Sequence, residues 1–360
     1  MALTEQQIKE GLSYVTEPDL KVNLVEGNLI QSINVNGDKA RVVVQVKNPA
    51  MHNRKRVQEA CEHYLKQHVG SEYTYDVEVV AMPKEEEQTA EPEGEALSEV
   101  KQVIAIASGK GGVGKSTITA NLATSLAKQG YRVGLIDADI YGPSAPMMFD
   151  VIYEKPEVSE INGKRYMLPV ETAYGVKVMS IGFFADPDQA VVWRGPMASK
   201  ALEQMFTDVF WGDLDYMLID LPPGTGDIHL TLVKQAPLTG AIVVSTPQPV
   251  ALADAQKGIA MFRLDSINVP VIGLVENMSF FIPEDMPDKK YFIFGKDGAK
   301  NLAQKMNTPL LGQIPLIQGI REAGDAGRPA AMQEDTPASL AFEEFAQKVI
   351  ALKPIPVPEQ

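Results

Sequence analysis

The sequence predicts an α/β domain with a mostly parallel sheet and helices on both faces, preceded by a small α+β domain. Short apolar strand-like runs alternate with amphipathic helical stretches from residue 101 onward, which is typical of right-handed βαβ units. The first 81 residues mix helical and strand patterns instead. An acidic segment separates the two parts, and 360 residues are enough for two domains.

In the first domain, Asn36-Gly37 between two strand-like runs predicts a β-hairpin. The expected elements, in order, are a helix over Ile8–Val15, strands over Leu24–Val35 and Lys39–Lys47, a helix over Arg54–His68 and a strand over Tyr73–Val80.

The boundary between the domains is predicted from composition. Residues 82–100 contain seven glutamates, one lysine and two prolines, with no aromatic residue and a net charge of −6. Such a segment buries too little apolar surface to offset the entropy lost on ordering. We therefore expect a small domain at 1–81, a flexible linker at 82–100, the α/β domain at 101–353 and a Pro-rich tail at 354–360.

The second domain shows six apolar strand candidates and six helical stretches. The strands are expected at Val103–Ser108, Arg132–Asp137, Tyr216–Leu221, Ala241–Ser245, Val271–Glu276 and Leu310–Ile314. The helices are expected at Ser116–Gln129, Met197–Phe210, Ile228–Gln235, Ala251–Phe262, Gly298–Lys305 and Pro337–Ala351.

Charge and cysteine content exclude several classes of function. The net charge of −14 makes a general nucleic-acid binder a poor expectation. A single cysteine, Cys61, excludes an intramolecular disulfide framework and a Cys₄ or Cys₂His₂ zinc site. We see no signal peptide at the start and no run of ~20 apolar residues, so we expect a cytoplasmic protein without a membrane partner.

The first predicted strand of the second domain runs into a glycine-rich loop. The loop, Gly109 to Thr117, fits the pattern G-x-x-x-x-G-K-[ST] between a strand and a helix. Its glycines let backbone N–H groups point inward, and the helix dipole adds to an anion site. Lys115 would contact the β and γ phosphates of ATP, and Ser116 would offer a hydroxyl to Mg²⁺. The expected nucleotide-binding residues are Gly109, Lys110, Gly111, Gly112, Val113, Gly114, Lys115, Ser116 and Thr117.

Aspartates end two predicted strands, at the sheet edge where ligands bind in such folds. Asp137 and Asp139 follow one strand, and Asp220 follows another in the position expected for a magnesium ligand. One such aspartate is often only a helix cap. We expect Ser116, Asp137 and Asp220 to bind Mg²⁺, and we see no His or Cys placed as a nucleophile's partner. The chemistry implied is attack of water on a phosphoryl group.

The run Gly109–Ser116 resembles the deviant phosphate loop of the ATPase group that includes MinD, ParA, the nitrogenase iron protein and the Mrp/ApbC proteins. The resemblance implies that Lys110 reaches the partner's nucleotide across a homodimer interface. It also implies that Asp139 orients the attacking water and that Asn277 contacts the adenine. From spacing alone, Asn277 is equally well explained as a turn residue.

Longer segments resemble the Mrp/ApbC family in particular, from about Val100 to Ala351. They are Asp137–Pro146, Trp193–Met197, Asp220–Asp227, Ser245–Gln248 and Glu276–Ser279. Leu24–Ile30 resembles, more weakly, the small metal–sulfur cluster assembly domain that often precedes this ATPase. The resemblance implies a carrier that passes a [4Fe–4S] cluster to client apo-proteins.

The sequence departs from this family where the cluster would bind. The family's CxxC pair is missing from Phe280–Phe294, and Lys47–His52 lacks the small domain's usual cysteine. Cys61 is expected to be a buried apolar residue. Glu284, Asp285 and Asp288 are hard ligands and poor substitutes for thiolates. His52, His63 and His68 share the small domain with Cys61, but we expect no metal there.

Three functions therefore compete. The first is a dimeric, ATP-hydrolysing cluster carrier or assembly factor, slow without a partner. The second is a nucleotide-gated scaffold without a cluster, and the third is a MinD- or ParA-like positioning ATPase. The third needs a membrane helix or a basic DNA-binding face, and the three prolines in residues 352–360 argue against an amphipathic anchor. Arg194 is the arginine that the motifs single out for testing.

Overall fold

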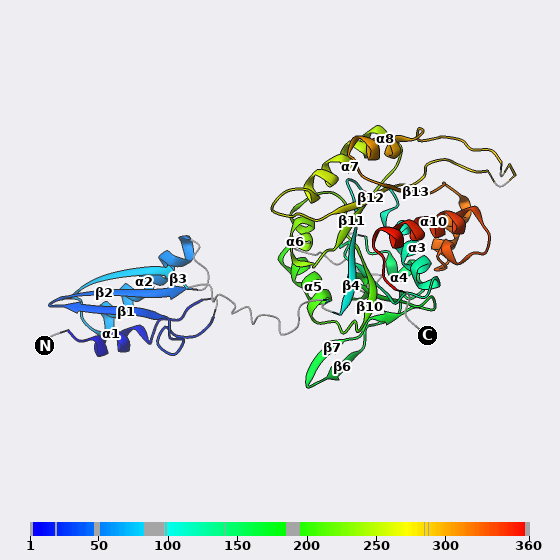
Figure 1. The fold of residues 1–360 in the computed structure, drawn as a ribbon. Helices are drawn as coiled ribbons and strands as arrows, with labels where there is room; N and C mark the ends of the chain where they lie inside the picture. Colours follow the sequence, from blue (N-terminus) through cyan, green and yellow to red (C-terminus); the bar gives the residue numbers. More distant parts are fainter. Residues whose placement is uncertain are drawn as a thin grey trace. The chain divides into compact units, whose positions relative to one another are not determined.

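A computed structural model of the chain describes residues 3–18, 20–46, 51–82, 97, 99–140, 142–184, 195–283, 285–286 and 288–356. Within it the chain divides into two compact units, Met1–Glu93 and Gly94–Gln360 (Figure 1). Most of the expected linker and the Arg194 segment lie outside the described residues, and the domain limits stay a prediction. No described helix is both long and apolar enough to cross a bilayer.

The smaller unit is a three-stranded sheet with two helices. Its elements are α1 (Glu5–Leu12), β1 (Ile30–Asn36), β2 (Lys39–Val46), α2 (Met51–His68) and β3 (Thr74–Ala81). The sheet order is β1-β2-β3, with β1 antiparallel and β3 parallel to β2. Alternate residues of β2 are buried, so one face of the sheet holds the core of this unit.

Two expectations for the smaller unit need correction. The first strand begins at Ile30 rather than Leu24, because residues 24–29 form a turn closed by a bond from Leu29 N–H to the Leu24 carbonyl. The first helix begins at Glu5 rather than Ile8, because Thr4 and Gln7 form a capping box. The hairpin is confirmed, with Asn36 and Lys39 paired across its turn.

The larger unit is built on an eight-stranded sheet with the order β13-β12-β11-β4-β10-β5-β9-β8. The sheet strands are β4 (Val100–Ser108), β5 (Val133–Asp137), β8 (Val170–Glu171), β9 (Val176–Ser180), β10 (Leu214–Asp220), β11 (Gly240–Ser245), β12 (Val271–Glu276) and β13 (Leu310–Gln313). All neighbouring pairs are parallel except β8 with β9. The mostly parallel α/β fold is thus confirmed.

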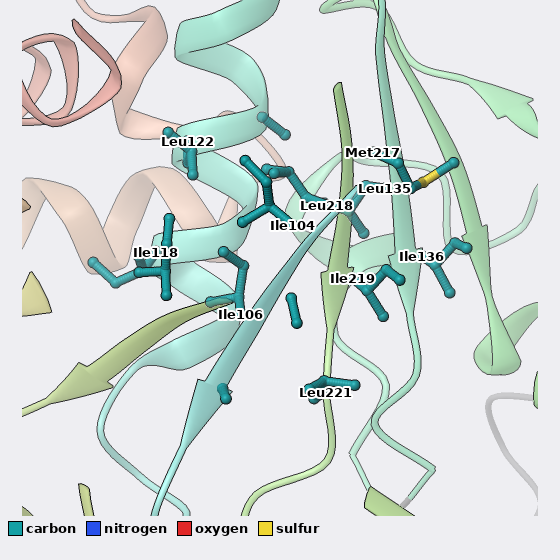
Figure 2. Packing of buried hydrophobic residues seen from close by; sticks show 14 of the residues in the cluster. Ile104, Ile106, Ile118, Leu122, Leu135, Ile136, Met217, Leu218, Ile219 and Leu221 are labelled. Carbon is teal, nitrogen blue, oxygen red and sulfur yellow. The ribbon is translucent and has the colours of Figure 1, made fainter. Parts of the chain in front are cut away.

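Helices cover both faces of this sheet (Figure 1). One face carries α3 (Lys115–Lys128) and α10 (Pro337–Leu352), with α4 (Ala145–Met148), α9 (Gln318–Asp325) and η2 (Ala330–Met332) alongside. The other face carries α5 (Gly195–Thr207), α6 (Asp227–Gln235), α7 (Pro249–Phe262) and α8 (Gly298–Lys305). Figure 2 shows Ile118 and Leu122 of α3 beside Ile104 and Ile106 of β4, which fixes the helix that follows the phosphate loop.

The segment between α4 and α5 contains elements that the sequence did not predict. These are the hairpin β6 (Val158–Ile161) and β7 (Lys164–Met167), the edge strands β8 and β9, and η1 (Ile181–Phe184). Helices α4 and α9 were missed as well. Each is eight residues or shorter, so periodicity gives little signal. The tail was expected to begin at residue 354, but Ile355 is buried and its carbonyl accepts a hydrogen bond from Tyr131.

Candidate nucleotide-binding site

The phosphate loop connects β4 to α3 at the carboxyl edge of the sheet. Gly112 and Gly114 have φ values of 79° and 80°, which favour glycine. Helix α3 begins at Lys115, so its N-terminus faces the loop. A cavity of about 240 Å³ lies here. It is lined by Ser108, Gly111, Gly112, Val113, Gly114, Lys115, Ser116, Thr117, Asp139, Ser144, Met148 and Pro223.

Asp220 at the end of β10 is the centre of the polar contacts in this site. Lys115 Nζ lies 2.8 Å from Asp220 Oδ1, and the Ser116 hydroxyl donates to Asp220 Oδ2 at 2.5 Å. The Thr119 hydroxyl donates to Asp220 Oδ1 at 2.8 Å. The structure thus brings the predicted Lys115, Ser116 and Asp220 together and adds Thr119, which the sequence analysis missed.

Asp137 lies on the neighbouring strand, in register with Asp220. Its Oδ2 accepts hydrogen bonds from the backbone N–H groups of Ser144 and Ala145 and from the Ser180 hydroxyl, each at 3.0 Å. Burial, together with the nearby charge of Asp220, raises the pKa of Asp137 to about 7. In this structure Asp137 anchors the start of α4, and its part in magnesium binding stays a prediction.

Asp139 also lines the cavity. Its Oδ2 lies 3.7 Å from Lys115 Nζ. This places a carboxylate beside the lysine that is expected to contact phosphate, as a water-orienting residue would require. The role itself remains a prediction.

Asn277 follows β12 and contacts the phosphate loop. Its side-chain amide donates to the Val113 carbonyl at 2.8 Å. Gly114 has a positive φ, and a Cβ built on it would lie 2.2 Å from Asn277 Nδ2, so a side chain here would displace that amide. Asn277 therefore holds the loop in shape here, and its expected adenine contact remains a prediction.

Lys110 lies in the loop but makes no ion pair with the described residues of its own chain. Its carbonyl accepts a hydrogen bond from the Ser108 hydroxyl at 3.0 Å, which fixes the backbone. The Lys110 side chain is only half-buried. This contrasts with Lys115, whose side chain is 6% exposed and held by Asp220 and Asp139.

Gly109 is required by packing rather than by its φ angle. A Cβ at this position would lie 2.2 Å from the backbone carbon of Asp254 in α7. A Cβ on Gly111, two residues away, would meet nothing within 4 Å. A side chain therefore fits at position 111 but not at position 109 without a shift of the backbone of α7.

We expect Gly109→Ala to lower the free energy of unfolding by about 2–3 kcal/mol, because the helix backbone must shift to admit a methyl group. Gly111→Ala, the matched control, keeps its N–H group and is expected to leave the thermal midpoint close to that of the wild type. Thermal unfolding of both variants checks this. Equal midpoints for the two would show that α7 adjusts without cost.

Among the described residues, the one thiol that could serve as an iron–sulfur ligand is that of Cys61. Cys61 on α2 is fully buried in the apolar core of the smaller unit. Burial, with the nearby charge of Glu62, raises the pKa of its thiol to about 12, so thiolate is scarce at neutral pH. His68 stacks on Tyr64 and on Tyr14, and His63 meets the Tyr64 ring edge-on. The described residues contain no group of three or more His, Cys, Asp or Glu arranged to hold a metal.

The segment that replaces the family's CxxC pair folds back on itself. Phe281 and Tyr291 pair across it, and Lys290 Nζ lies 4.2 Å from the centre of the Phe280 ring. Glu284 lies outside the described residues. In this segment, cation–π and backbone contacts occupy the place of the family's usual CxxC pair.

The fold and the phosphate loop define a P-loop NTPase of the MinD/ParA-like class. A family model for NUBPL iron-transfer P-loop NTPases matches residues 99–350, and one for iron–sulfur cluster assembly proteins matches residues 5–74. The chain belongs to this NUBPL iron-transfer P-loop NTPase family, and the predicted resemblance to Mrp/ApbC proteins is confirmed.

Two relatives show how far the likeness extends. An iron–sulfur cluster carrier protein of Synechocystis sp. is 42% identical over 351 residues, which are 98% of this chain and 98% of that protein. The iron–sulfur cluster transfer protein NUBPL of Dictyostelium discoideum is 45% identical over 257 residues, which are 71% of this chain and 77% of that protein. The likeness to the first spans both units.

Solved structures agree with the fold. A nucleotide-binding protein from Archaeoglobus fulgidus, in complex with ADP, has a TM-score of 0.58 and 38% identity, covering 67% of this chain and 92% of that one. The cell division ATPase MinD from Pyrococcus furiosus has a TM-score of 0.51 and 24% identity, covering 70% of this chain and 99% of that one. The second likeness concerns the fold alone.

Proposed function

We propose that the protein is a homodimeric, Mg²⁺-dependent ATPase that acts in the transfer of iron–sulfur clusters to client apo-proteins. The observation that carries this is the convergence of Lys115, Ser116 and Asp220 at the N-terminus of α3. The names of the relatives, an iron–sulfur cluster carrier protein and an iron–sulfur cluster transfer protein, support the cargo.

The side chains present fit a magnesium ion. Ser116 Oγ and Asp220 Oδ2 are hard oxygen donors that lie next to each other, and Mg²⁺ takes such ligands directly or through water. Ser116 and Asp220 would hold the ion, which would supply positive charge to stabilise the charge that develops on the phosphoryl group. Lys115 would turn from Asp220 toward the phosphates, and Asp139 would orient the attacking water.

Hydrolysis would depend on dimerisation. We assign Lys110 to the nucleotide of the partner protomer, as an arginine finger acts in trans. Its half-buried side chain, without an ion pair among the described residues, leaves it available for such a contact. This assignment rests on the resemblance of the loop to the deviant phosphate loops.

A nucleotide-gated scaffold without a cluster is the alternative that the sequence analysis kept open, because the family's usual cysteine ligands are missing. A symmetric dimer would bring together two copies of Cys61, each buried, whereas a [4Fe–4S] cluster takes four thiolates. In this alternative the ATPase cycle gates a scaffold, and the smaller unit recruits a client that holds the cluster. The ATP chemistry is the same in both cases.

Anaerobic reconstitution with iron and sulfide separates the two candidates. As a cluster carrier, the ATPase-active full-length protein is expected to bind about one cluster per dimer by iron analysis and visible absorption. Clearly less than one cluster per dimer would favour the scaffold. Cys61→Ser is the matched control. Stoichiometric cluster that is lost in Cys61→Ser would show that the chain holds the cargo itself through ligands other than the family's.

A further inference from the structure

Asp220 receives three polar contacts, and they come from three residues in the first turn and a half of α3. Lys115 and Thr119 reach Oδ1, and Ser116 reaches Oδ2. A strand-end carboxylate that must present one oxygen to a metal needs its other oxygen held in place. These three contacts differ in whether they can persist when nucleotide is bound.

The proposed function, on which this inference rests, gives Lys115 and Ser116 other roles when nucleotide is bound. Lys115 is assigned to the phosphates and would leave Oδ1 of Asp220 when the site fills, whereas Ser116, whose oxygen is assigned to Mg²⁺, contacts only Oδ2. Thr119 lies one helical turn beyond Lys115, is 1% exposed and does not line the cavity. Its hydroxyl is the contact with Oδ1 that the loaded site leaves in place.

The hydroxyl of Thr119 has two acceptors within reach. It lies 2.8 Å from Asp220 Oδ1 and 3.0 Å from the Lys115 carbonyl, but it carries a single proton. A carboxylate is the stronger acceptor, so the proton belongs to Asp220. We infer that Thr119 is a positioning residue that holds Oδ1 of Asp220, so that Oδ2 faces the magnesium ion.

Thr124 provides a matched control in the same helix. It is fully buried, and its hydroxyl donates to the carbonyl of Ala120, four residues earlier, at 2.9 Å. The Thr119 oxygen lies in the corresponding place, 3.0 Å from the carbonyl of Lys115, four residues earlier. Thr124 has no contact with Asp220 among the hydrogen bonds of the described residues, so a purely structural effect of losing a buried threonine hydroxyl would appear at both positions.

The test is a Mg²⁺ titration of the full-length protein with fluorescent N-methylanthraniloyl-ADP, followed by the same measurement in EDTA. We expect Thr119→Val and the smaller Thr119→Ala to raise the Mg²⁺ concentration for half-maximal binding by ~10-fold or more, because a hydrogen bond to a charged group is lost. In EDTA the affinity for ADP should stay within about 2-fold of the wild type, since Thr119 does not line the cavity. Thr119→Ser should restore the Mg²⁺ midpoint, and Thr124→Val should leave it unchanged.

Three results would overturn the inference. They are a wild-type Mg²⁺ midpoint in Thr119→Val or Thr119→Ala, a Thr119→Ser protein as impaired as Thr119→Val, and an equal shift in Thr124→Val. A wild-type protein whose ADP binding ignores Mg²⁺ would overturn the proposed function as well. Binding of Mn²⁺ in the presence of ADP, followed by electron paramagnetic resonance, reports the metal site without any turnover.

Discussion

Replacing Lys115 with alanine is expected to abolish ATP hydrolysis and to weaken nucleotide binding by about 100-fold or more, because the positive charge that contacts the β and γ phosphates is removed. Equilibrium binding of labelled ATP and phosphate release from unlabelled ATP measure the two effects. Near-normal turnover in a folded variant would remove Lys115 from the phosphate site.

Stability has to be followed alongside activity. Lys115 and Asp220 are both nearly buried and lie 2.8 Å apart, so the alanine variant leaves a carboxylate without its cation. Lys115→Arg is the matched variant, because it keeps the charge but changes the shape of the donor group. We expect Lys115→Arg to fold with a thermal midpoint above that of Lys115→Ala and still to hydrolyse ATP poorly.

Replacing Lys110 with alanine is expected to slow hydrolysis by at least about 100-fold while leaving ATP binding nearly unchanged, as for a charge supplied in trans. The reason is geometric: within its own chain the ammonium has no ion pair in the described structure, whereas Lys115 is held by Asp220. Lys128→Ala, an exposed lysine at the end of α3, is the matched control and should behave as the wild type. Near-normal turnover of Lys110→Ala would remove its proposed role.

A mixing experiment tests whether Lys110 acts across the dimer. Asp139→Asn should bind ATP but lose the water-orienting carboxylate, while keeping its own Lys110. In a heterodimer with Lys110→Ala, one of the two sites has both groups. An equimolar mixture should therefore recover roughly a quarter of wild-type turnover if protomers of a two-fold dimer exchange at random. No recovery, with exchange verified by size-tagged protomers, would place Lys110 in the site of its own chain.

The sequence predicted the larger unit better than the smaller one, for physical reasons. Strands β4, β10, β11 and β12 each contain a buried, mostly apolar run because both faces of the sheet are covered, and such runs are easy to recognise. In the smaller unit, Leu24 and Leu29 are buried but belong to a turn. The strand was predicted to begin too early because apolar residues at these positions were taken as part of its pattern.

The candidate site was predicted in part. The spacing of residues in the sequence predicted the loop and Asp220. The contacts of Asp137 with Ser144 and Ser180 could not be predicted this way, because these residues lie on segments that come together only in the folded chain. Thr119 was missed because a threonine inside a helix carries no motif of its own. Its distance from Asp220 can be known only when α3 packs against β10.

Cys61 is the one thiol of the whole sequence, and it is sealed within the smaller unit. An electrophilic reagent can reach it only when that unit opens, so the labelling rate measures the free energy of that opening alone. The larger unit contributes nothing to the signal, since it contains no cysteine. The native chain therefore carries a reporter that can show, without an introduced cysteine, whether ATP or a client changes the stability of the smaller unit.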